Sequence, residues 1–198
     1  MSRRTKSTPS PQLPRELLHA AMELERRTMN LYCRFENLFA DRDEIRSFWF
    51  DMAQHESRHF GALALVDGLL EATPRRGLPT GAGLTRERVQ HLRALLDRFD
   101  AEVQAGLPLA RAFEIALEIE SSEIEDVVLD LLSAVKGEEE RERAAQLLIH
   151  DLGDLGYMIE KYTNNHALLA RADEALEHRV GRLRRKPPTR PRLRRVKG

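Results

Sequence analysis

One stretch decides how this chain is read, Gln54-His55-Glu56-Ser57-Arg58-His59. The apolar residues around it recur every three or four positions, as in an amphipathic helix, and Glu56 and His59 fall inside that apolar face. Removing a carboxylate from water is costly, so its burial requires a compensating partner, and a metal ion is the leading candidate. The surrounding apolar positions are Ile45, Phe48, Met52, Leu63, Val66 and Leu70.

Three further stretches repeat this pattern, each with an acid inside an apolar helix face. Glu25 lies in the first, Glu120 in the third, and Asp151 and Asp154 in the fourth. Four such helices predict an all-α bundle with a carboxylate-lined centre, and we expect Tyr32 to be buried with its hydroxyl bonded near that centre. The apolar positions are Leu18, Ala21, Met22, Met29, Tyr32 and Phe39; Phe113, Ala116, Leu117, Ile124, Val127 and Leu131; and Ala144, Leu148, Met158 and Tyr162.

The acids also follow an internal repeat. Glu25 and Glu56 are separated by 31 residues, as are Glu120 and Asp151, and the second pair follows the first by 95 residues. Two helical hairpins of one design, related by a pseudo-two-fold axis, would produce this spacing, and chance similarity between amphipathic helices is the alternative. The matching positions are His55 with His150, Glu56 with Asp151, and His59 with Asp154.

These segments resemble the rubrerythrin-like branch of the ferritin-like di-metal carboxylate proteins, over roughly residues 15–170. That family has Glu on helices one and three and Glu-x-x-His on helices two and four. Glu25 with Tyr32 resembles its first helix, residues 52–59 its second, and residues 112–120 its third. The resemblance implies a ferritin-like four-helix bundle with a long crossover that contains a short extra helix.

The resemblance also implies a non-haem iron centre, with one or two irons per chain and manganese or zinc as other metals. It implies peroxide reduction or ferrous iron oxidation, with Glu56 or Glu120 bridging the metals. The single cysteine, Cys33, excludes a rubredoxin module, so an external electron donor is expected. The implied metal ligands are Glu25, Glu56, His59, Glu120, Asp151 and Asp154.

The fourth segment departs from the family pattern, because Asp151-Leu152-Gly153-Asp154 stands where Glu-x-x-His is expected. Asp is one methylene shorter than Glu, and Asp in place of His removes a nitrogen ligand and adds negative charge. A second metal position therefore has three possible outcomes: it is kept with oxygen ligands alone, kept with lower affinity for metal, or lost. His150, four residues before Asp154, offers a mixed site instead.

Charge is unevenly distributed although the formal net charge is zero. Residues 1–15 hold four basic residues and residues 178–198 hold ten, with no acid in either, whereas residues 16–177 hold 18 basic and 32 acidic residues. We expect a disordered basic arm at 1–13, a bundle at 14–175 and a basic tail at 176–198. The tail is either simply solvated or binds nucleic acid or an acidic surface non-specifically, which makes a tethered, non-catalytic metal-binding or scaffold bundle the alternative function.

Residues that cap or interrupt helices predict the boundaries of the helices. Pro14, the cap Thr85 and Gly137 mark helix ends, and residues 73–83 form a break rich in Gly and Pro. We expect no membrane span and a cytoplasmic location. We also expect a homodimer, since bundles of this type commonly pair. The expected helices are 15–39, 42–71, 85–104, 108–136 and 138–170.

Overall fold

The protein is all-α in the part of the chain that the computed structural model describes, which is residues 15–72, 85–122, 129 and 138–184. This confirms the all-α part of the predicted fold class. None of the described helices is long and apolar enough to cross a lipid bilayer. The helices are α1 (Arg15–Leu38), α2 (Asp43–Ala72), α3 (Arg86–Ala105), α4 (Leu109–Glu120), α6 (Glu138–Tyr162) and α7 (His166–Arg184).

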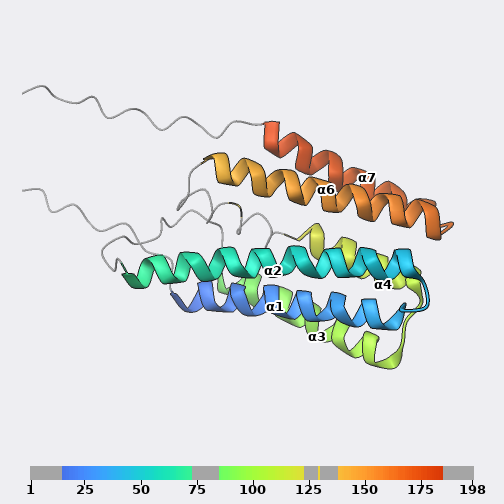
Figure 1. Ribbon diagram of the computed structural model, residues 1–198, viewed down its shortest axis with the longest axis horizontal. Helices are drawn as coiled ribbons and strands as arrows, with labels where there is room; N and C mark the ends of the chain where they lie inside the picture. Colours follow the sequence, from blue (N-terminus) through green and yellow to red (C-terminus); the bar gives the residue numbers. More distant parts are fainter. Residues whose placement is uncertain (1–14, 73–84, 123–128, 130–137, 185–198) are drawn as a thin grey trace, which may run out of the picture.

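The helices are arranged as two neighbouring groups (Figure 1). In the first, α1 and α2 pack side by side after a short turn at residues 39–42, and α3 packs against α1. In the second, α6 and α7 form a pair, and α4 contacts α6. Figure 1 shows α2 between α1 and the α6–α7 pair. Residues on the inner sides of α1, α2, α4 and α6 therefore meet at the centre.

Local signals fix most helix ends near their predicted positions. Thr85 caps α3, because its Oγ1 accepts a hydrogen bond from the backbone N–H of Arg88 at 3.3 Å. Gly106 ends α3 with a φ of 81°, a conformation that residues with a Cβ rarely adopt. Pro108 then precedes α4, where its missing N–H costs no helical hydrogen bond.

The predicted fourth helix is wrong at its C-terminal end. It does not run to residue 170: α6 stops at Tyr162 and a separate helix, α7, begins at His166. Asn165 starts α7, since its Oδ1 accepts a hydrogen bond from the backbone N–H of Leu168 at 3.0 Å. Thr and Asn side chains bond to nearby backbone groups and so compete with helix continuation. Residues 176–184, predicted as the start of the basic tail, belong to α7.

The predicted third helix also ends early. α4 stops at Glu120, where residue 136 was expected, because Ser121 and Ser122 are poor helix formers and begin a turn. Positions 123–128 and 130–137 lie outside the described residues. They include Ile124, Val127 and Leu131, which belong to the predicted apolar face. The predicted arm at 1–13 and residues 185–198 of the predicted tail also lie outside the described residues.

An aromatic cluster forms the core beside the centre. Trp49 is fully buried, and its ring stacks on Phe113 with the ring centroids 5.4 Å apart. Phe35 and Phe48 each place a ring centroid 4.8 Å from that of Trp49. This cluster joins α1, α2 and α4 and stabilises them by burying large apolar surfaces.

Arg111 ties the end of α3 to α4, and this contact gives stability a pH dependence. Its Nε and Nη2 donate to the Glu102 carboxylate at 2.7 and 3.1 Å, which holds the pKa of Glu102 below its usual range. A lowered pKa stabilises the folded state above the unfolded pKa, and that contribution is lost as the pH falls. We expect Glu102→Gln to cost about 1 kcal/mol at pH 7 and clearly less at about pH 3, measured by urea unfolding.

The control for this prediction is Glu139→Gln, which removes an exposed partner of Arg143. Exposed pairs contribute about 0–1 kcal/mol, so this variant should change stability less than Glu102→Gln at pH 7. An equal cost of Glu102→Gln at both pH values would contradict the assigned role of the Arg111–Glu102 pair.

Candidate metal centre

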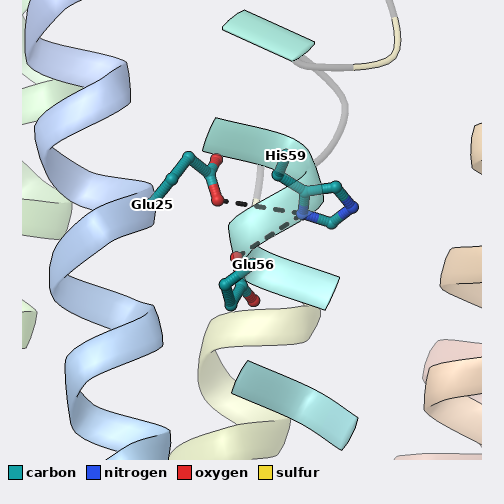
Figure 2. Close-up of side chains that lie close together, drawn as sticks. All are labelled: Glu25, Glu56 and His59. Carbon is teal, nitrogen blue, oxygen red and sulfur yellow. Dashed lines mark ion pairs between the residues drawn. The ribbon is translucent and has the colours of Figure 1, made fainter. Parts of the chain in front are cut away.

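Glu25, Glu56 and His59 converge at the centre of the described helices. Glu25 comes from α1, and Glu56 and His59 come from adjacent turns of α2. Figure 2 shows both carboxylates turned toward the His59 ring. His59 Nδ1 lies 3.5 Å from Glu56 Oε2 and 3.8 Å from Glu25 Oε2, and one ligand atom of each residue lies within 4.8 Å of the others.

Burial places these side chains in a medium of low polarity. Glu25 is 2% exposed, Glu56 is 1% exposed, and the His59 side chain is 12% exposed. Two carboxylates this close repel each other strongly when water does not screen them. A divalent cation between them would reverse that repulsion, which makes the cluster suited to binding metal.

The distances in the cluster fit a metal ion. Ligand atoms about 2.1 Å from a four-coordinate ion lie about 3.4 Å from one another. The distances from His59 Nδ1 to the two carboxylates, 3.5 and 3.8 Å, are slightly larger, and the three ligand atoms all lie within 4.8 Å of one another. One imidazole nitrogen and two carboxylates form a donor set that iron, manganese and zinc all accept. The predicted ligands Glu25, Glu56 and His59 are thus brought together.

Glu120 is buried close to the centre but is not part of this cluster. It is the last residue of α4 and is 1% exposed, and the Tyr32 hydroxyl donates a hydrogen bond of 2.8 Å to its Oε1. The expected burial of Tyr32 and the bonding of its hydroxyl near the site are confirmed. The bond joins α1 to α4 and sets the direction of the Glu120 carboxylate.

Arg179 also holds Glu120, and sequence reasoning missed it. Arg179 is 7% exposed, and its Nη2 donates to the carbonyl oxygens of Glu120 and Ser122 at 3.0 and 3.1 Å. These bonds cap the C-terminal end of α4. A signal was present, since Arg179 follows Leu168 and Ala172 at helical spacing on the buried face of α7, but it was counted as part of a tail.

Asp151 is buried and faces α2. It is 2% exposed, and its Oδ1 lies 2.6 Å from Nδ1 of His55, whose side chain is 18% exposed. The pair joins α6 to α2 one residue away from Glu56. Asp151 therefore lies on the predicted side of α6 but is engaged by His55, outside the cluster of three.

Asp154 is not brought into the centre. Its side chain is 55% exposed, and its Oδ2 lies 3.1 Å from Nδ1 of His150, which is 69% exposed. The buried face of α6 contains Leu148, Leu152 and Leu155, and Asp154 lies to one side of that face. His150 and Asp154 do share a face, as expected, but it is a solvent-exposed one.

Comparisons with known proteins add no relative: no family model matches the chain, and no curated protein or solved structure matches it. The chemistry of the centre is therefore inferred from its own residues. Of the six predicted ligands, three converge, two are buried but engaged by Tyr32 and His55, and one lies at the surface.

Proposed function

We propose that this protein is a non-haem iron protein of the ferritin-like four-helix type that binds one iron ion through Glu25, Glu56 and His59. The observation that carries the proposal is the convergence of these three side chains, with both carboxylates almost fully buried. Natural proteins rarely bury carboxylates together unless a cation or hydrogen bonds compensate for them. The resemblance of residues 15–59 to the rubrerythrin-like pattern supports iron over manganese or zinc.

Each residue has a defined task in this proposal. Glu25 and Glu56 supply anionic oxygen ligands from two helices, and His59 supplies the nitrogen ligand. Their burial limits the access of water and holds the ligands in place before the metal arrives. When bound, iron would supply one-electron exchange between its ferrous and ferric states.

One metal per chain is proposed rather than two. A second position would need Glu120 and Asp151, which are held by Tyr32 and His55 at 2.8 and 2.6 Å. It would also need a nitrogen ligand on α6 where Asp154 stands, and that side chain is largely exposed. The altered fourth segment thus favours the mononuclear form of the centre.

The proposed activity is redox turnover, either oxidation of ferrous iron or reduction of peroxide with electrons from an external donor. The test loads the protein with one equivalent of Fe(II) without oxygen and mixes it with hydrogen peroxide in a stopped-flow spectrometer. We expect ferric absorbance to appear faster than for free Fe(II). In His59→Ala the rate should fall by at least about tenfold toward that of free iron.

A metal-binding bundle without turnover is the second candidate, and the surface position of Asp154 favours it. A centre with three protein ligands and no second metal has fewer electrons to deliver to peroxide. In this case the protein would bind iron, but peroxide would oxidise it no faster than free iron. The same stopped-flow experiment separates the two candidates.

A further inference from the structure

The buried charges of the described residues are unequal in sign. Four acids are at most 2% exposed, whereas Arg179 is the one basic residue of the described chain that is buried, at 7% exposed. Burying either charge is costly, so buried ions are retained where they compensate one another. Arg179 is thus the buried cation that the described chain offers to this group of acids. The four acids are Glu25, Glu56, Glu120 and Asp151.

Three of these acids lie at one level of the bundle, next to the aromatic cluster. Each is seven residues, or two helical turns, from an aromatic residue of its own helix. Side chains in a helix lean toward its N-terminus, so the Tyr32 hydroxyl reaches toward Glu25, and Glu120 accepts its hydrogen bond on that side. Glu120 therefore lies beside the candidate metal centre. The pairs are Glu25 with Tyr32, Glu56 with Trp49, and Glu120 with Phe113.

Arg179 reaches Glu120 from α7. Its Nη2 donates to the backbone oxygens of Glu120 and Ser122, which places the guanidinium at the residue that carries the Glu120 carboxylate. Capping a helix end does not by itself require a buried charge, because water or a glycine turn serves the same purpose, and α3 ends with Gly106. A buried guanidinium exceeds that need, and a nearby carboxylate explains it.

A guanidinium at this position has two consequences for metal binding. It compensates the Glu120 carboxylate when no metal is present, and it repels a further cation from that carboxylate in a medium of low polarity. Arginine stays protonated at any physiological pH, so this charge is permanent. A second metal at Glu120 would have to overcome it.

We propose that Arg179 is the built-in cation that balances Glu120, and that its charge limits the centre to one metal ion. Arg179 is no ligand; it determines how many metal ions the buried acids accept. This inference rests on the proposed function, because it concerns metal held beside Glu25, Glu56 and His59.

The number of bound irons tests the limit in Arg179→Met, which removes the charge and keeps a long side chain. The full chain is dialysed to equilibrium against Fe(II) without oxygen, and iron is counted by mass spectrometry of the element. We expect about one iron per chain in wild type and clearly more than one in Arg179→Met, with the first bound at least about threefold more tightly. Arg179→Lys keeps the charge and should stay at about one. The matched control is Arg171→Met, at an exposed Arg of α7, which should also stay at about one.

A second comparison needs no metal and separates charge from capping. Glu120→Gln keeps the backbone oxygen that Arg179 binds and removes the charge of the side chain. Metal-free Arg179→Met should unfold at a lower urea concentration than wild type, because it leaves Glu120 less compensated. Adding Glu120→Gln to Arg179→Met should recover at least about a third of that loss, whereas a helix cap alone predicts no recovery.

The outcomes separate this inference from the proposed function. One iron per chain in both wild type and Arg179→Met would overturn the inference and leave the proposed function in place, and so would a double variant no more stable than Arg179→Met. No iron in wild type would overturn the proposed function and the limit on metal number together. If Arg179→Met does not fold, Glu120→Gln decides: it should be less stable than metal-free wild type, and equal or greater stability would overturn the inference.

Discussion

Glu56→Gln is expected to make the metal-free protein more stable and to remove its response to metal. Glu56 is 1% exposed, and its carboxylate lies in one cluster with that of Glu25. Replacing one of two close, buried carboxylates with a neutral isostere relieves their repulsion, so we expect a gain of about 1–2 kcal/mol without metal. The same change removes a ligand and should weaken metal binding more than about 100-fold. Urea unfolding with and without Fe(II), under nitrogen, measures both effects.

The control for this prediction is Asp154→Asn, which changes an exposed carboxylate outside the cluster. In wild type and in this variant, metal at 100 times its dissociation constant should add about 2.7 kcal/mol to the free energy of unfolding. Glu56→Gln should show no such gain. Metal-free Glu56→Gln that is less stable than wild type would indicate that Glu56 serves the fold rather than a metal.

Trp49→Ala is expected to lower the free energy of unfolding more than any other variant named above. Trp49 is fully buried and contacts the rings of Phe35, Phe48 and Phe113. Truncation would leave a cavity where α1, α2 and α4 meet, at a cost of about 3–5 kcal/mol. Chemical unfolding followed by circular dichroism measures the loss.

Two variants make this prediction decisive even if Trp49→Ala does not fold. Trp49→Phe keeps an aromatic ring and should recover more than half of the loss. Leu147→Ala removes an exposed side chain and should cost less than about 0.5 kcal/mol. A cost for Trp49→Ala equal to that of Leu147→Ala would contradict the central position of Trp49 in the core.

The features that the sequence predicted correctly depend on short-range periodicity. The spacing of apolar residues placed Glu25 and Glu56 on buried helix faces, and both are buried. The short turn between α1 and α2 makes these helices neighbours, so their ligands meet with no long-range information. For the same reason the cluster combines residues from α1 and α2 alone.

The features that it missed depend on how distant helices rotate and pack. Asp154 matches His59 in the repeat, yet the buried face of α6 is turned so that Asp154 reaches solvent. Its burial is set by the direction from which α4 and α7 contact α6, which periodicity does not encode. Arg179 was missed because it was counted within a run of basic residues, although its helical spacing from Leu168 and Ala172 places it on the buried face of α7.

Iron content per chain tests the central claim most directly. Wild type, Glu25→Gln and His59→Ala are reconstituted with Fe(II) without oxygen, desalted without chelator and analysed by mass spectrometry of the element. If Glu25, Glu56 and His59 form the centre, wild type retains about one iron per chain and both variants retain almost none. No iron in wild type, or equal iron in all three proteins, would contradict the assignment.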